Sequence, residues 1–307
     1  MSYSPSATPS ATDFVALDPT ARVRGRAPLR IPVRTGPGEL VVEVAGRGPP
    51  VLLVHGWAVD RRMWSHQLAA FRRVFTTVTY DRRGAGETTA PCDYTLELQD
   101  VDTILDEIGL PKAGILGMSQ GGRVALQYAM TRPHRVTGLV LQGVPLDDPP
   151  ARTLGDQSLL PLDRFAEMLR RGNRESLLRE LEQHPLMAAG PRRALVQDEI
   201  VAMLQDYRGE DLTASLAASL AEHLPLHAAD LREVRAPTLV ITGSRELLWF
   251  RRIADRMARN IYGARRRVIR GGGHFVNMTH AGDYNRCVVE FFINTTRVWS
   301  ERALGSI

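Results

Sequence analysis

Strand-like and helical segments alternate along most of this chain of 307 residues. Continuous apolar runs, such as PVLLV at 50–54, are typical of strands that are buried on both faces of a parallel sheet. The alternation therefore predicts an α/β fold with a mostly parallel sheet covered by helices. The predicted strands cover 29–34, 39–45, 50–54, 76–80, 113–117, 136–142, 237–241 and 267–269, and the predicted helices cover 62–71, 96–108, 121–130 and 281–298.

The stretch from about residue 146 to residue 231 interrupts this alternation. Its Leu- and Arg-rich segments have a helical pattern, are separated by glycine and proline, and include no strand-like run. Because the strand pattern resumes afterwards, we interpret 146–231 as a helical cap inserted into one core formed by 26–145 and 232–307. Residues 1–25 are rich in Ser, Ala, Thr and Pro and are predicted to be a disordered leader.

Composition narrows the classes of partner. The formal net charge is +5, but the Arg runs are scattered among acidic residues and lack interleaved aromatics, so we expect a solvated basic surface and no nucleic-acid binding. Two cysteines, Cys92 and Cys287, cannot build a disulfide framework. No apolar run has transmembrane length, and the leader lacks the regions of a signal peptide. We therefore expect a cytoplasmic protein that binds no membrane.

The segment Gly117-Met118-Ser119-Gln120-Gly121 fits the pattern G-x-S-x-G and lies between a predicted strand and a predicted helix. Flanking glycines permit a sharp turn that exposes a serine hydroxyl at the carboxyl edge of a sheet. The backbone N–H groups of the helix N-terminus favour negative charge beside that hydroxyl. A Gly-rich turn can produce the same pattern, but the strand–helix context predicts Ser119 as a nucleophile.

The segment HGW at 55–57 follows the predicted strand 50–54. A loop at this place can point the backbone N–H of Trp57 toward the same oxygen atom as the N–H of Gln120. The competing interpretation is a glycine turn closed by a packed tryptophan. We predict that Trp57 and Gln120 form an oxyanion hole.

The segment DRRGAG at 81–86 follows the predicted strand 76–80. Its GxG pattern is not followed by the further glycines of a phosphate-binding loop, so it is only a weak signal for phosphate binding. We interpret the segment as a charged turn held by Asp81 and Arg83.

His274 follows three consecutive glycines that come directly after a late core strand. Such a loop suits an imidazole that must reach over another part of a site. His280 begins the last predicted helix and is expected to lie at the surface or to cap that helix. His184, His223 and His227, in the predicted cap, are expected to face solvent or cap surfaces. With Ser119 upstream, the pattern predicts His274 as the general base.

The segments HGW, DRRGAGE, GMSQGG, PTLVITGSRE and GGGHFV, in this order, resemble the α/β-hydrolase superfamily. The chain is most similar to its capped subfamily, which contains carboxylesterases, enol-lactonases, cofactor-free haloperoxidases and C–C bond hydrolases. The resemblance covers about residues 40–292, and the cap matches only in kind. It implies a mostly parallel sheet of eight strands with helices on both faces and an inserted helical cap.

The resemblance also implies roles for individual residues. Ser119 corresponds to the nucleophile, His274 to the base, and Trp57 and Gln120 to the oxyanion donors. In similar proteins an Asp stands three residues after the glycine that ends the late strand; here Glu246 occupies that place. Glu246 is therefore the predicted acid, and the alternatives are Asp147 or Asp148, or an incomplete triad.

The predicted substrate is a small, largely apolar carboxylic ester or lactone, because Trp57, Met118 and apolar cap residues are expected to line the pocket. No metal or organic cofactor is required, since no metal-ligand spacing occurs and the serine route needs none. Ser119 in the turn between strand and helix excludes the members of this superfamily that use Asp as the nucleophile at that position. A thioesterase, a C–C bond hydrolase, a perhydrolase and a ligand-binding receptor with slow turnover remain open, as does the oligomeric state.

Overall fold

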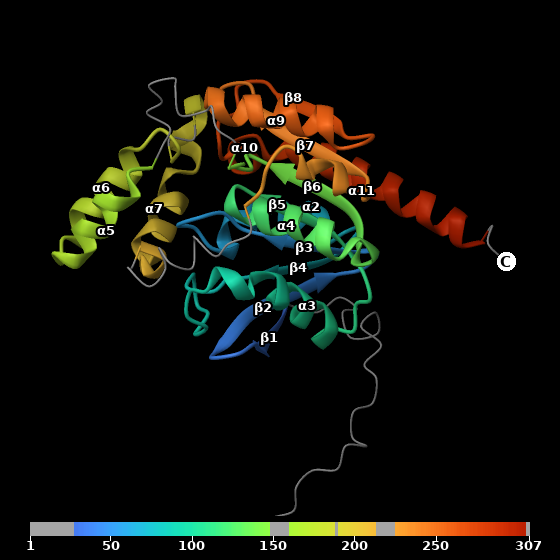
Figure 1. Ribbon diagram of the computed structural model, residues 1–307, viewed down its shortest axis with the longest axis horizontal. Helices are drawn as coiled ribbons and strands as arrows, with labels where there is room; N and C mark the ends of the chain where they lie inside the picture. The colour runs from blue at the N-terminus through green and yellow to red at the C-terminus, as the bar shows by residue number, and fades with distance from the viewer. Residues whose placement is uncertain (1–27, 148–159, 188–189, 213–224, 305–307) are drawn as a thin grey trace, which may run out of the picture.

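A computed structural model describes residues 28–147, 160–187, 190–212 and 225–304 of the chain (Figure 1). Within these ranges an eight-stranded sheet has the order β1-β2-β4-β3-β5-β6-β7-β8. β1 and β4 each pair antiparallel with β2, and the other neighbours pair parallel, which confirms the predicted fold class. The strands are β1 Leu29–Arg34, β2 Glu39–Gly46, β3 Pro50–Val54, β4 Thr76–Tyr80, β5 Ala113–Met118, β6 Val136–Gln142, β7 Thr238–Gly243 and β8 Arg265–Ile269.

The central strands are buried on both faces because nearly every position in them is uncharged and most are apolar. Every residue of β4, β5 and β7 is buried. β1 and β8 form the two edges of the sheet and expose most of their side chains. Because the parallel strands run in one direction, the residues that follow β3, β5, β6, β7 and β8 meet at one edge, where α/β proteins bind ligands.

Helices cover both faces of the sheet, as predicted (Figure 1). One apolar cluster joins the sheet to α3, α4 and α9 through Ile104, Val124 and Met257. A second cluster, on the opposite face, joins it to α2 and α11 through Phe71 and Phe292. In the part of the chain that is described, no helix is both long and apolar enough to cross a membrane. The helices are α2 Ser65–Phe71, α3 Glu97–Glu107, α4 Gln120–Thr131, α9 Leu248–Asn260 and α11 Ala281–Leu304.

Two helical elements differ from the prediction. The predicted helix 62–71 starts as a 3₁₀ turn at Arg61–Trp64, where the side chain of Asp60 accepts a hydrogen bond from the Arg62 N–H, and only then continues as α2. A short helix, α10 Val276–Thr279, was not predicted. Four residues are too few to show a helical period, so the sequence pattern could not reveal it.

The described part of the predicted cap is helical. α5 Leu162–Arg170, α6 Arg174–Gln183 and α7 Gln197–Asp206 form a group to one side of the sheet (Figure 1). Their apolar faces contribute Phe165 and Met203 to the same buried cluster as Trp64 of the core. The described stretches 160–187, 190–212 and 225–231 include no strand. The predicted leader 1–25 and the rest of the cap, including 148–159 and 213–224, lie outside the described residues.

The segment 206–211, at the end of α7, lies against loops of the core. Asp206 Oδ2 pairs with the Arg62 guanidinium at 2.6 Å. Glu210 Oε2 accepts a hydrogen bond of 2.9 Å from the Cys92 N–H. These contacts place one end of the predicted cap directly beside the loops that follow β3 and β4.

Candidate active site

Ser119 forms the turn between β5 and α4 with a φ of +53° and a ψ of −121°. A non-glycine residue in this region costs roughly 1–3 kcal/mol, so its surroundings must hold it there. Neighbouring glycines make the close packing possible. A Cβ at Gly117 would lie 2.4 Å from the Gly121 oxygen, and a Cβ at Gly121 would lie 2.2 Å from the His55 oxygen. The sharp strand-to-helix turn, called the elbow below, is therefore present and places Ser119 at the N-terminus of α4.

His274 and Glu246 form a buried pair at the ends of β8 and β7. The distance from His274 Nδ1 to Glu246 Oε2 is 2.9 Å, and the residues are 3% and 4% exposed. A carboxylate only accepts hydrogen bonds, so Nδ1 is the donor, and in the neutral form of the imidazole the lone pair lies on Nε2. His274 Nε2 is buried and has no hydrogen-bond partner among the described residues. The second oxygen of Glu246 accepts from the Leu247 N–H at 2.9 Å, which fixes the carboxylate.

The space around this pair is filled on two sides. The Phe250 ring lies 4.7 Å from the His274 ring, centroid to centroid. Gly143 has a φ of +56°, and a Cβ there would lie 2.6 Å from His274 Cε1. Glycine at residue 143 therefore leaves room for the imidazole, a requirement that the sequence alone did not reveal.

Gln142, the last residue of β6, connects the elbow to the His274 loop. Its backbone oxygen accepts from the Ser119 N–H at 2.7 Å. Its side-chain Nε2 donates to the His274 oxygen at 2.8 Å and to Asn277 Oδ1 at 3.0 Å. Gln142 and Asn277 are completely buried, so these hydrogen bonds are sheltered from water. Through Gln142 the structure brings the loops of Ser119 and His274 together, and nothing in the sequence pattern singled it out.

The β3 loop, residues 55–60, packs on the elbow. A Cβ at Gly56 would lie 2.7 Å from Met118 Sδ and 3.4 Å from Ser119 Cβ. Gln120 is the first residue of α4, where backbone N–H groups have no intrahelical acceptor. Trp57 directly follows Gly56, so both residues with predicted oxyanion donors flank Ser119. Met118 is only 1% exposed, and its side chain packs against Gly56 of the β3 loop. The sequence predicted Met118 in the pocket lining instead.

The chain is similar to proteins of known family. Residues 49–281 match the family model described as the alpha/beta hydrolase fold. The chain belongs to the α/β-hydrolase fold family. The 2-hydroxy-6-oxononadienedioate/2-hydroxy-6-oxononatrienedioate hydrolase of Cupriavidus pinatubonensis is 31% identical over 271 residues, which cover 85% of this chain and 89% of that protein.

Solved structures are similar over the same region. A thermophilic esterase from Thermogutta terrifontis is 25% identical and superposes with a TM-score of 0.73, covering 88% of this chain and 99% of that one. The enol-lactonase from Burkholderia xenovorans LB400 is 21% identical, with a TM-score of 0.70 over 86% of this chain and 100% of that one, and it shows the fold alone. With such relatives, this α/β hydrolase is an enzyme of the hydrolase class.

In this α/β hydrolase the alternative acid, Asp147, is engaged by other partners. Its Oδ2 pairs with the Arg123 guanidinium at 2.8 Å and accepts from the Leu226 N–H at 2.8 Å. The other alternative, Asp148, lies outside the described residues. Glu246 rather than Asp147 therefore stands against His274.

His55 holds the β3 loop in place and is not placed to act as a base. Its Nε2 accepts from the Arg82 N–H at 2.8 Å, and its Nδ1 donates to the Gly56 oxygen at 2.9 Å. Complete burial, reinforced by the nearby Arg82 charge, lowers the pKa of His55 to about 3. The neutral imidazole thus links the loops that follow β3 and β4.

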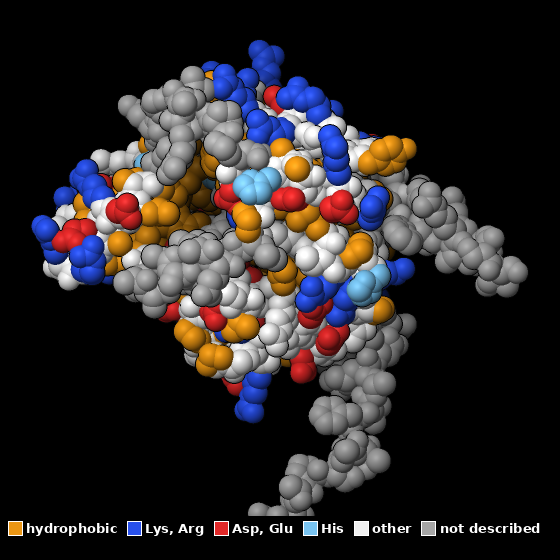
Figure 2. Space-filling view, in the orientation of Figure 1, with side chains coloured by type: hydrophobic (Ala, Val, Ile, Leu, Met, Phe, Trp, Pro, Cys, Tyr) orange, Lys and Arg blue, Asp and Glu red, His pale blue; other side chains and the backbone are white. Residues whose placement is uncertain are grey.

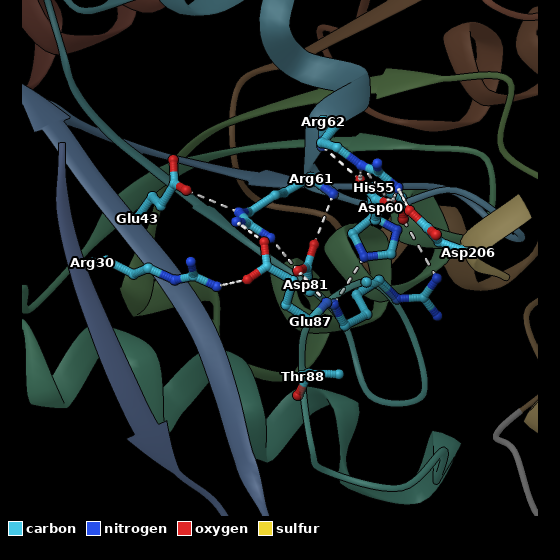
Figure 3. Close-up of polar contacts among 12 residues, drawn as sticks. Arg30, Glu43, His55, Asp60, Arg61, Arg62, Asp81, Glu87, Thr88 and Asp206 are labelled. Carbon is cyan, nitrogen blue, oxygen red and sulfur yellow. Dashed lines mark hydrogen bonds and ion pairs between the residues drawn. The ribbon is translucent and has the colours of Figure 1, made fainter. Parts of the chain in front are cut away.

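The segment 81–86 is the charged turn that the sequence suggested. Asp81 accepts hydrogen bonds of 2.9 Å from the Arg61 N–H and the Glu87 N–H, and it pairs with the Arg61 guanidinium (Figure 3). Burial raises the pKa of Asp81 to about 6, and Arg61 opposes this shift. Arg83 pairs with Asp100 at 2.7 Å. These ion pairs and hydrogen bonds hold the turn.

The lowered pKa of His55 predicts a specific dependence of stability on pH. The unfolded chain takes up a proton near pH 6.5 while the folded chain does not, so the stability that His55 contributes falls as the pH drops from 6.5 toward 3. We expect the free energy of unfolding of the parent, relative to His55→Asn, to fall by about 2 kcal/mol between pH 7 and pH 5. Urea unfolding of both proteins at the two pH values measures this difference. A difference that stays constant with pH would contradict the neutral, buried His55.

Proposed function

We propose that this α/β hydrolase is a serine hydrolase that cleaves a small carboxylic ester or lactone through an acyl-enzyme. The observation that carries the proposal is the buried pair of His274 and Glu246, with Nδ1 and Oε2 2.9 Å apart, whose loop is linked through Gln142 to the strained elbow at Ser119. This pair leaves the lone pair of His274 Nε2 available to take a proton.

In the proposed reaction, Ser119 Oγ attacks the substrate carbonyl carbon as its proton passes to His274 Nε2. The N–H groups of Trp57 and Gln120 donate to the oxyanion that forms, and Glu246 stabilises the imidazolium. His274 then gives its proton to the leaving oxygen, and the acyl-enzyme remains. Water attacks the acyl-enzyme by the same route, with His274 as base, and Ser119 regains its proton.

The choice of substrate rests on the site and on the relatives. Esterase and enol-lactonase are the activities named for the two similar structures. A second candidate is a hydrolase of a dienedioate-type carbonyl compound, the substrate named for the Cupriavidus relative. An ester or lactone needs only the groups named above, so we place it first.

The acyl-enzyme is tested directly by mass spectrometry. We expect a fluorophosphonate to add one phosphonyl group to the parent protein, on the peptide that includes Ser119. In parallel, methyl esters and lactones of increasing chain length should show steady turnover. Labelling of a different residue would contradict the proposal, and a single burst without turnover would indicate a ligand-binding receptor instead of an enzyme.

A further inference from the structure

A small pocket, partly open to solvent, lies beside the β3 loop. It is enclosed by the β3 loop, the loop after β4, the start of α4 and the segment 206–211 of the cap. Trp57 and Gln120, which flank Ser119, line it. Because Trp57 and Gln120 are the proposed oxyanion donors, this pocket lies on the oxyanion side of the proposed site, and Ser119 itself is not one of its lining residues. The hollow between the cap and the core is visible in Figure 2.

The pocket has aromatic walls. Tyr94 and Tyr207 line it together with Trp57, and the Trp57 and Tyr207 rings meet edge to face with centroids 5.4 Å apart. Aromatic rings can attract a cation through the negative charge of their faces, so aromatic side chains are suitable neighbours for a cationic group.

The positive charges that line the pocket are neutralised by partners behind its wall. The Arg82 guanidinium pairs with Glu97, and both side chains are almost completely buried. Arg83 pairs with Asp100 at 2.7 Å, and both are again buried. The charge of each arginine is thus offset by the charge of a buried carboxylate.

Asp211 carries the negative charge of the pocket. Its two oxygens accept hydrogen bonds from Trp57 Nε1 and from the Tyr207 hydroxyl, both of which are neutral donors. Burial raises the pKa of Asp211, which is the expected effect of an apolar surrounding on a carboxylate, whereas its hydrogen bonds to Tyr207 and Trp57 lower the pKa. A carboxylate in such a place is stabilised by a cation and destabilised by a second anion.

We infer that this pocket is a substrate subsite for a primary ammonium group, formed by Asp211 and the rings of Trp57, Tyr94 and Tyr207. The inference rests on the proposed function and adds to it a substrate class, the esters of short amino acids or amino alcohols. A substrate with a carboxylate at that position is expected to react more slowly, because Asp211 would repel it. The sequence predicted a largely apolar pocket. The structure differs, because Asp211 and two arginines form part of the wall.

Three methyl esters of equal length test the subsite. Methyl 4-aminobutanoate, methyl pentanoate and monomethyl glutarate end in an ammonium, a methyl and a carboxylate group. We expect the parent kcat/KM, measured by the carboxylic acid that hydrolysis forms, to be at least about tenfold higher for the ammonium ester than for the carboxylate ester, a difference of about 1.4 kcal/mol. Asp211→Asn should bring this ratio close to one.

Asp206→Asn is the matched control, because Asp206 lies on the same segment, is 59% exposed and pairs with Arg62 outside the pocket. The ratio should be unchanged in this variant. If Asp211 had only a structural role, its loss would lower kcat/KM equally for all three esters. An unchanged ratio in Asp211→Asn, or the absence of any charge preference in the parent, would overturn the subsite.

A binding measurement separates the subsite from the proposed function. We expect n-butylammonium to quench the intrinsic tryptophan fluorescence of the parent, n-butanoate not to, and Asp211→Asn to bind the cation at least about tenfold more weakly. If this holds while no ester is cleaved, the subsite stands and the proposed esterase fails. If esters are cleaved but neither ion binds, the subsite fails and the esterase stands.

Discussion

Replacing Ser119 with alanine is expected to lower kcat for ester hydrolysis by at least roughly 10⁴-fold while leaving the fold intact. Only the hydroxyl oxygen is removed, so the elbow keeps its Gly117 and Gly121 contacts and the hydrogen bond from the Ser119 N–H to Gln142. The melting temperature should stay close to that of the parent. Initial rates on an activated ester, together with thermal unfolding, measure the two effects.

Ser65→Ala is a suitable control for this substitution. Ser65 is exposed, and its hydroxyl donates a hydrogen bond of 3.2 Å to Glu199 of α7. It lies in a different segment of the chain from the elbow. This variant should hydrolyse esters and react with a fluorophosphonate as the parent does. Persistent hydrolysis or labelling in Ser119→Ala would show that the nucleophile is another residue.

Replacing Glu246 with glutamine is expected to lower kcat by about 10⁴-fold, or about 5 kcal/mol of transition-state stabilisation. The carboxylate at 2.9 Å holds the proton on His274 Nδ1 and stabilises the imidazolium, and a neutral amide does neither well. The substitution keeps the size of the side chain, so the free energy of unfolding should change by much less than the activation free energy. Glu246→Asp should retain partial activity, because its carboxylate reaches less far.

Asp147→Asn is the matched comparison for the acid. Asp147 is bonded to Arg123 and to the Leu226 N–H, so the loss of its charge should change stability slightly and kcat little. Steady-state kinetics of the two variants decide between the carboxylates. Near-parent kcat in Glu246→Gln with a collapse in Asp147→Asn would show that the acid is misassigned. If neither matters, the reaction runs on a Ser–His pair.

The sheet and most of its helices could be predicted because their determinants are local. A strand that is buried on both faces must be apolar at nearly every position, and runs such as 50–54 and 237–241 satisfy this without reference to the rest of the chain. The elbow is local in the same way, since Gly117, Ser119 and Gly121 lie within one turn. The sequence by itself therefore determined the fold class, the elbow and the residues Ser119 and His274 as candidates.

The acid was left open for a geometric reason. Glu246 and Asp147 follow β7 and β6, which are neighbours and end at the same edge of the sheet, so their order along the chain does not show which one reaches His274. Only the packed structure shows that Asp147 is bound to Arg123 and that Gly143 leaves room for the His274 ring.

The tertiary structure alone also decided the character of the pocket. Asp211 and Trp57 are 154 positions apart along the chain, and they meet only because the segment 206–211 packs against the β3 loop. The link that Gln142 makes between the elbow and the His274 loop likewise joins residues 132 positions apart. Side-chain contacts between distant segments depend on how the elements pack, and a local pattern of residue types does not record that packing.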